Sequence, residues 1–313
     1  MRNRLAFVAA VMAAAACGRG GGAATQEQAT APAPPPGVRA APVIDSHVHL
    51  SYLRAADRLA RAGVLGAVDL GAPIGTVGNG EAPLAALVQA GPMLTSPGGY
   101  PINAWDPGGY GQACTLDTCV EATVAAIAAR GGRVVKLVVA PDGLDATLVP
   151  HAVHAAHQRG MKVAVHALGD DEAQLAAKQD CDVLAHTPVE PLTDETIAAW
   201  RGRAVVSTLA AFGGRETTVE NLRKLRAGGV TVLYGTDLGN TQTPAVDPDE
   251  LKLLRAAGLD DAAIVAAMTT TPAAYWGITF DDDTYVRLAR DPARDADAYL
   301  EPLQVWADGK QLR

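Results

Sequence analysis

Residues 43–50 read VIDSHVHL, a short apolar run that ends in two histidines separated by one residue. Side chains alternate across a β-strand, so Asp45, His47 and His49 are predicted to point to one face. Two imidazoles at the end of a buried strand are either a polar part of the core or half of a metal site. The rest of the sequence has to supply the other ligands if the metal site is correct.

Seven further apolar runs follow this stretch, separated by Ala-rich amphipathic segments of helical length. Runs that are apolar on both faces are typical of parallel strands covered by helices. Together with 43–49, the predicted strands are 64–69, 92–96, 133–139, 161–167, 182–187, 204–208 and 230–236. Eight strands alternating with helices predict an α/β fold, a (β/α)8 TIM barrel over residues 42–280. A doubly wound open sheet is the alternative on this pattern alone, but no Gly-rich dinucleotide motif follows any of the strands.

Polar side chains gather at the C-terminal ends of the predicted strands, where TIM barrels form their active sites. They are His47, His49, His166, His186 and Asp237. Lys136 interrupts the apolar run VVKLVV and is predicted to face the barrel interior. A charged lysine is rarely buried without a partner, so Lys136 either pairs with a carboxylate or carries a modification that removes its positive charge.

This set of residues resembles the ligand pattern of the amidohydrolase superfamily. The pattern is His-x-His after the first strand, a carbamylated lysine after the fourth, histidines after the fifth and sixth, and an aspartate after the eighth. It falls on His47, His49, Lys136, His166, His186 and Asp237. The stretches AHTP (185–188), GTD (235–237) and AAMTTTPAAYWGI (266–278) resemble the imidazolonepropionase-related and prolidase-like branch of this superfamily.

The resemblance implies an enzyme with two divalent metal ions, zinc being favoured, and a CO2-derived carbamate on Lys136 that bridges them. His47, His49 and Asp237 would hold one ion, and His166 and His186 the other. It further implies that a metal-bridging hydroxide attacks the substrate and that Asp237, the catalytic residue, passes a proton to the leaving group. The implied reaction is hydrolysis of amide-type C–N bonds in small molecules such as dipeptides or N-acyl amino acids.

Three alternatives to this hydrolase remain open at the level of sequence. They are a mononuclear deaminase of a heterocycle, a lactone or ester hydrolase, and a non-catalytic envelope lipoprotein. Imidazolonepropionase is mononuclear and lacks the lysine, so Lys136 argues against that activity. Members of this branch usually build a small β-sandwich from both chain ends. Few residues precede Val43 outside a low-complexity stretch, so residues 281–313 are expected to form a reduced C-terminal β segment.

The loop after the third predicted strand, SPGGYPINAWDPGGYG (96–111), is rich in Gly, Pro and aromatic residues. Loops at this face of a barrel usually shape substrate specificity. Tyr100, Asn103 and Trp105 are therefore candidate substrate-binding residues. The alternative is a spacer held by Cys114 and Cys119, which either form a small loop disulfide or remain free thiols.

The N-terminal region has the features of an export signal. Residues 1–17 combine a basic start, a short apolar segment and small residues before Cys17, and they resemble a bacterial lipoprotein signal peptide in which Cys17 is lipidated. Residues 18–41 are rich in Gly and Pro and are predicted to be a disordered tether. The expected location is therefore the bacterial cell envelope or periplasm.

The net charge of −8 argues against nucleic acid and against an anionic membrane surface as partners. The expected partner is a small-molecule substrate, and membrane contact is expected only through the lipid anchor.

Overall fold

The computed structural model describes residues 37–105 and 108–313, and the predictions for the signal peptide and Cys17 lie outside them. Parallel strands alternate with helices along most of this region, as predicted. The strands of the barrel are β2 (Val43–Val48), β3 (Val64–Asp69), β4 (Ala86–Gln89), β5 (Met93–Thr95), β7 (Val134–Val138), β8 (Lys162–His166), β9 (Val183–Leu184), β10 (Ala204–Val206) and β11 (Thr231–Leu233). A short strand, β6 (Gly111–Ala113), pairs with β5.

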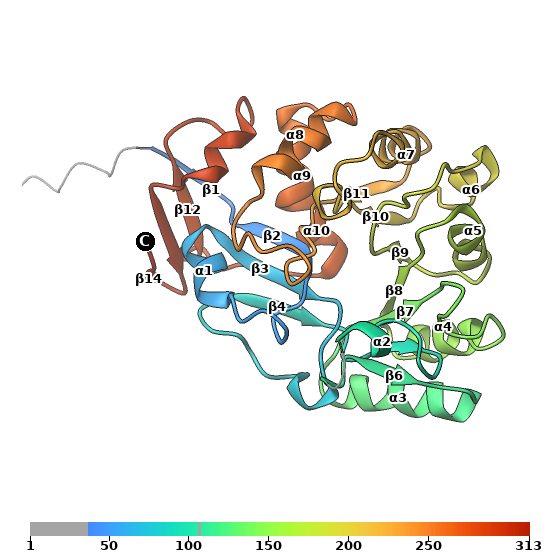
Figure 1. The fold of residues 1–313 in the computed structure, drawn as a ribbon. Coiled ribbons are helices and arrows are strands. Elements are labelled where there is room, and N and C mark those ends of the chain that lie inside the picture. The colour runs from blue at the N-terminus through green and yellow to red at the C-terminus, as the bar shows by residue number, and fades with distance from the viewer. Residues whose placement is uncertain (1–36, 106–107) are drawn as a thin grey trace, which may run out of the picture. The chain divides into compact units, whose positions relative to one another are not determined.

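The helices are α1 (Ala56–Arg61), α2 (Ile102–Trp105), α3 (Asp117–Ala129), α4 (Val149–His157), α5 (Asp170–Lys178), α6 (Asp194–Ala199), α7 (Glu216–Ala227), α8 (Pro248–Ala256), α9 (Asp261–Met268) and α10 (Thr270–Trp276), with 3-10 turns η1 (Ile74–Thr76), η2 (Ala210–Phe212) and η3 (Ala296–Leu300). In Figure 1 the helices α3 to α7 lie on the outer side of the strands. Among the described residues, no helix has the length and apolar character needed to cross a membrane.

The order of the parallel strands is consistent with the predicted TIM barrel, and backbone hydrogen bonds connect the edges of two sheets. The parallel ladders form two sheets, ordered β11-β10-β9-β8-β7-β5-β6 and β2-β3-β4. At one seam, Ser46 N donates to Tyr234 O (2.9 Å) and His49 N donates to Leu238 O (2.7 Å), so β2 lies beside the end of β11. At the other seam, Arg133 N donates to Gln89 O (3.3 Å). The hydrogen bonds at the first seam bring the ends of β2 and β11, the first and last parallel strands, together.

The third strand of the barrel differs from its prediction. The sequence predicts one strand at 92–96, whereas the structure has two short strands, β4 and β5, with a break at residues 90–92. β4 pairs with β3, and β5 pairs with β7 through Leu94 and Leu137. Pro92 cannot donate to a ladder, so the chain changes partner at this point.

Two apolar clusters fill the space inside and outside the strands. Val134, Ala164 and Val206 belong to the interior cluster, which Trp276 and Ile278 also join. Val135 and Val163, one residue along the same strands, belong to the cluster that packs against the helices. Alternate residues of one strand therefore pack into different clusters. Continuous apolar sequence predicts this arrangement, because both faces of such a strand are covered.

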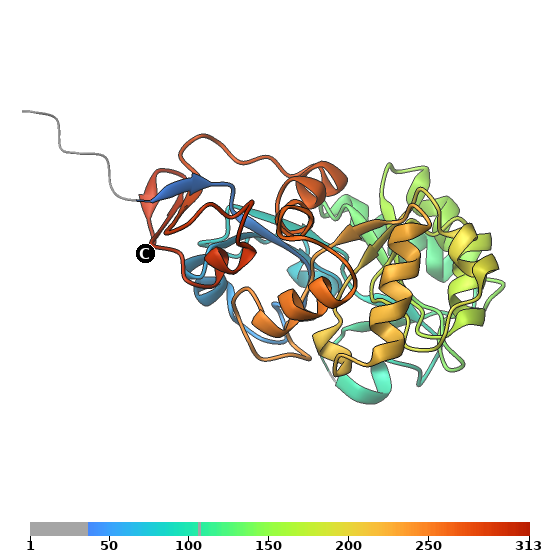
Figure 2. The same ribbon diagram turned by 90° about the horizontal axis from the view of Figure 1, so that it is seen from above.

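A small antiparallel sheet joins the two ends of the described chain. Its order is β1 (Val38–Ala40), β12 (Tyr285–Leu288), β13 (Gln304–Ala307) and β14 (Lys310–Gln311), and Figure 2 shows β1 beside the C-terminal strands. The predicted tether boundary at residue 41 is therefore wrong. Residues 38–40 are too few to stand out in the sequence, and they form a strand only because β12 supplies hydrogen bonds, with Val38 opposite Leu288.

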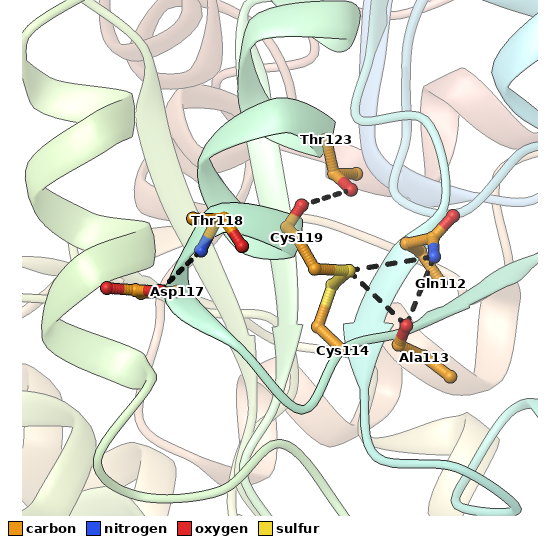
Figure 3. The surroundings of a disulfide bond; sticks show 7 residues. All are labelled: Gln112, Ala113, Cys114, Asp117, Thr118, Cys119 and Thr123. Carbon is orange, nitrogen blue, oxygen red and sulfur yellow. Dashed lines mark hydrogen bonds between the residues drawn. A yellow bond between two sulfur atoms is a disulfide. The ribbon is translucent and has the colours of Figure 1, made fainter.

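Cys114 and Cys119 form a disulfide, which resolves the two alternatives left open by the sequence. It links the residue after β6 to the first turn of α3, just after the loop at 96–111 (Figure 3). The Cys119 sulfur also lies 3.4 Å from the carbonyl oxygen of Ala113. The disulfide therefore anchors one end of the loop that carries Tyr100 and Trp105.

Candidate metal centre

Three predicted ligands converge at the C-terminal ends of β2 and β11. One ligand atom from each of His47, His49 and Asp237 lies within 4.8 Å of the others, and all three side chains are buried. Nε2 of His47 and Nε2 of His49 are 3.2 Å apart, and the Asp237 Oδ1 is 3.5 Å and 3.2 Å from them. Two imidazoles and a carboxylate aimed at one point form a donor set suited to a divalent cation.

The other ring nitrogen of each histidine faces a backbone carbonyl. Nδ1 of His47 is 2.8 Å from Ala185 O, and Nδ1 of His49 is 3.4 Å from Gly71 O. A carbonyl oxygen only accepts, so each Nδ1 carries the hydrogen and each Nε2 presents its lone pair to the shared point. Metal-ligating histidines are oriented in this way by the groups behind them.

The Asp45 carboxylate links the end of β2 to the turn after β11. Its Oδ1 accepts from the backbone N–H of His47 (3.0 Å) and of Thr236 (3.1 Å), and its Oδ2 accepts from the Thr236 hydroxyl (2.5 Å). Burial raises the pKa of the Asp45 carboxyl to about 7 despite these hydrogen bonds. Asp45 thus supports His47 through the backbone, and it also fixes the residue next to Asp237.

The turn after β11 packs directly on the histidine strand. Asp237 N donates to His47 O (2.9 Å), and Asp237 has a left-handed backbone with φ of 56°. Gly239 has a φ of 124°, and a Cβ at this position would lie 2.8 Å from the Cβ of His49. Only glycine combines this conformation with so close an approach, so the backbone here is shaped around the ligands.

His166 and His186 lie beside this cluster. The ring centroid of His186 is 4.5 Å from that of His47 and 5.1 Å from that of His166. Nδ1 of His186 is 3.2 Å from the Thr208 hydroxyl, whereas the buried Nδ1 of His166 has no hydrogen-bond partner among the described residues. An orphaned buried nitrogen costs free energy unless a ligand completes it, so it fits a second cation.

Three histidines of the centre, His47, His166 and His186, are held neutral. Burial, together with the charge of Lys136, lowers the pKa of His47 well below its usual value and that of His166 to about 3. Burial and the neighbouring His47 likewise lower the pKa of His186. A neutral imidazole is the form that binds a metal ion.

Lys136 is buried on β7, where residue 136 pairs with Ala164 of β8, an interior residue. Burial lowers the pKa of its amine to about 7, and the charge of Asp237 offsets this only in part. No ion pair between Lys136 and a carboxylate is present in the described part of the chain. The structure therefore supports the prediction that Lys136 faces inward. The alternative, in which Lys136 forms an ion pair with a carboxylate, has no such pair to support it among the described residues.

The three candidate substrate contacts separate in the structure. The Trp105 ring centroid lies 4.6 Å from that of His49, and the Tyr100 ring stacks on His166 at 5.1 Å. Asn103 instead donates its side-chain amide to Asp142 (3.0 Å). Tyr100 and Trp105 thus border the centre, whereas the Asn103 side chain is used to hold the loop.

Sequence reasoning missed further residues at this centre. Phe212, on the turn after β10, has its ring 5.0 Å from His186, and Tyr52 stacks on Trp105 at 4.9 Å. Asn240 donates to both carboxylate oxygens of Asp237. Asn240 could have been suspected from its position three residues after the predicted ligand Asp237. Phe212 and Tyr52 lie outside the α-helices and strands, where no periodic pattern of the sequence indicates the direction of a side chain.

The comparisons with known proteins agree with this fold. No protein-family model matches the sequence, and no curated protein shows significant sequence similarity to it. Among solved structures, a Xaa-Pro dipeptidase with bound methionine has a TM-score of 0.72 and 18% identity, with 87% of this chain and 86% of that chain covered. A prolidase complexed with N-methylphosphonate-L-proline has a TM-score of 0.73 and 16% identity, with 87% of this chain and 86% of that chain covered. Phenylurea hydrolase B has a TM-score of 0.68 and 16% identity, with 87% of this chain and 84% of that chain covered. These similarities establish a shared fold.

Proposed function

We propose that this chain is a metal-dependent amidohydrolase that hydrolyses amide-type C–N bonds in small molecules such as dipeptides or N-acyl amino acids. The observation that carries the proposal is the convergence of two histidine Nε2 atoms and the Asp237 carboxylate at the C-terminal mouth of the barrel. The names of the structural neighbours, a Xaa-Pro dipeptidase, a prolidase and a phenylurea hydrolase, support the choice of bond.

Two divalent cations, with zinc as the favoured metal, suit the donor set. His47, His49 and Asp237 would hold one, and His166 and His186 would hold the other, with Lys136 between them as its carbamate. Cations bound there would polarise the substrate carbonyl and make water a stronger acid. The neutral imidazoles and the orphaned nitrogen of His166 support this assignment.

Lys136 has the properties needed to form a carbamate. Because its pKa is lowered to about 7, a large share of the amine is neutral at neutral pH and can attack CO2. The nitrogen forms a bond to the carbon of CO2 and loses one proton to solvent, which leaves an anionic carbamate in place of a cation. An anion at this position removes the cost of burying an ammonium among metal ligands.

Asp237 is proposed to move the proton in the reaction. Burial opposes its ionisation, but the pKa of its carboxyl is lowered, and the hydrogen bonds from the Asn240 amide favour the carboxylate form. The carboxylate is therefore ready to accept a proton from the attacking water. It can then return that proton to the leaving nitrogen, which avoids expulsion of an unstable amide anion.

Aromatic side chains are proposed to bind the groups beside the scissile bond. Trp105, Tyr100 and Phe212 lie against three different histidines of the centre. Their faces suit a flat or apolar substituent.

Metal analysis combined with a substrate screen tests the proposal. The expected result is two equivalents of metal in the wild type and turnover of a dipeptide, an N-acyl amino acid or a urea. Asp237→Asn should retain metal and lose almost all turnover, whereas His47→Asn should lose metal. His154→Asn is the matched control, because His154 is exposed on α4 and contacts Gln158. One equivalent of metal with deaminase activity, or no metal, would contradict the proposal.

We also propose that the protein is exported to the cell envelope and lipidated at Cys17, with a small molecule as its partner. The support is the sequence of residues 1–17. Metabolic labelling with a fatty acid should mark the wild type and leave Cys17→Ser unlabelled. Equal labelling of the two would contradict lipidation at this residue.

A further inference from the structure

Asn240 makes an unusual contact with the Asp237 carboxylate. It lies three residues further along the turn after β11, and its Nδ2 is 3.2 Å from Oδ1 and 3.1 Å from Oδ2 of Asp237. Only the amide nitrogen can donate, so the nitrogen side of Asn240 must face the carboxylate. A donor shared by both oxygens opposes rotation of the carboxylate about its bond to Cβ.

This contact is not needed to form the turn. Asn240 N and Thr241 N both donate to Asp237 O, at 3.1 and 3.0 Å. The Thr241 hydroxyl donates to Thr236 O (3.0 Å), and Asp237 N donates to His47 O. These hydrogen bonds hold the backbone of the turn without the Asn240 side chain. The main role of that side chain is therefore its contact with the Asp237 carboxylate.

The orientation of Asp237 matters because its two oxygens face different surroundings. Oδ1 is the oxygen near both His47 Nε2 and His49 Nε2. Rotation of the carboxylate would take Oδ1 away from this point and would also displace Oδ2, the oxygen left to exchange a proton with the substrate. Small errors in the position of a reacting group reduce rates strongly.

Asn240 also connects Asp237 to the other side of the barrel mouth. Its side chain also interacts with the Tyr100 hydroxyl and lowers the pKa of that group, against the larger effect of burial, and the Tyr100 ring stacks on His166. One amide therefore contacts the ligand at the end of β11 and an aromatic ring that covers the ligand at the end of β8. No pattern within a single strand would bring these groups together.

We propose that Asn240 is a positioning residue that fixes the rotation of the Asp237 carboxylate between the metal ligands and the substrate. Its effect on catalysis rests on the proposed hydrolase function, but its effect on the carboxylate does not. The predicted consequence of removing the amide is a centre that still folds and binds metal but presents Asp237 in the wrong orientation.

The test compares Asn240→Leu with Gln242→Leu. Both changes replace an amide by an apolar group of similar size in the same turn, but the Gln242 amide donates to Gly239 O (3.0 Å) instead of to a carboxylate. The measurements are crystal structures without added metal, the visible absorption of the Co2+-loaded proteins, and kcat and KM on the best substrate of the screen. Thermal unfolding checks that each variant is folded.

The expected result for Asn240→Leu is a rotated Asp237 carboxylate, a shifted Co2+ absorption band and a kcat about 10- to 100-fold below wild type, with KM unchanged. Gln242→Leu should match the wild type in all three. An unrotated carboxylate in Asn240→Leu refutes the proposal whatever the activity, and so does a wild-type kcat with a rotated carboxylate. A wild type that hydrolyses no substrate would refute the proposed function alone, because the crystal structures and the Co2+ spectra still decide the role of Asn240.

Discussion

The buried amine of Lys136 should make the metal-free protein less stable than a variant that lacks it. Lys136 lies inside the barrel with 1% of its surface exposed, and burial lowers its pKa from 10.5 to about 7. In the unfolded chain the amine is solvated and keeps the higher pKa. The folded state therefore binds this proton more weakly than the unfolded state does, and protonation favours unfolding.

The size of this effect follows from the shift in pKa. Each pKa unit corresponds to about 1.4 kcal/mol, so the cost to the free energy of unfolding is on the order of 4 kcal/mol at pH 7. Because the folded pKa is the lower one, stability is complete above pH 10.5 and is lost as the pH falls from 10.5 to about 7. At pH 9 the remaining cost is about 2 kcal/mol.

Lys136→Met removes the amine and keeps an unbranched side chain. In chelator-treated protein and CO2-free buffer, the variant should be more stable than wild type by about 4 kcal/mol at pH 7, or on the order of 10 °C in thermal midpoint. The advantage should shrink to about 2 kcal/mol at pH 9. With metal and bicarbonate added, the order should reverse, because only the wild type gains the free energy of metal binding.

Lys162→Met is the control for this experiment. Lys162 is a half-buried lysine on the neighbouring strand β8, with its ammonium 4.4 Å from the centre of the Tyr275 ring. Loss of that contact should give no gain in stability. The reasoning is refuted if metal-free Lys136→Met is less stable than wild type at pH 7, or if the difference between them does not fall as the pH rises.

Three further predictions concern the surroundings of the centre. Burial raises the pKa of the Glu250 carboxyl to about 7, so the stability of the wild type should fall as the pH rises from 4.5 to about 7. In urea unfolding, Glu250→Gln should therefore increase the free energy of unfolding by about 3 kcal/mol at pH 8 and by about 1 kcal/mol at pH 5. Replacing Cys114 and Cys119 by serine should cost about 2 kcal/mol, because the disulfide closes a short loop, and dithiothreitol should destabilise the wild type to a similar extent. Gly239→Ala places a Cβ 2.8 Å from the Cβ of His49 at a φ of 124°, so it should cost ~1–3 kcal/mol and weaken metal binding, as measured by thermal unfolding and metal titration. A variant as stable as wild type in the last case would show that the turn adjusts without disturbing His49.

Part of the fold could be predicted from local patterns. The strand at 43–49 and the runs around Lys136 and His166 are recognisable because both faces of each strand are covered, which gives continuous apolar sequence. The strand β4 was not recognised, since its four residues stand apart from β5 beyond a proline. β1 was assigned to the tether, because three residues form a strand only when a distant partner is present. Short elements of this kind take their structure from tertiary pairing.

The sequence could also predict the kinds of ligand in the centre but not all of their surroundings. His47 and His49 are on one side of β2 by the alternation of a strand. His186 is different, because β9 ends at Leu184 and the backbone beyond it sets the direction of the imidazole. Phe212 and Tyr52 were missed for a related reason, since loop residues follow no period.

The amino-acid sequence by itself determined which side chains stand at the strand ends and that Lys136 points inward, because a two-residue period is a local property of extended backbone. Tertiary structure alone decided that His47 lies against His186, that Asp45 binds Thr236, and that Asn240 contacts both Asp237 and Tyr100. These contacts depend on the meeting of the first and last strands and on the paths of the loops. Both are set by packing over the whole chain.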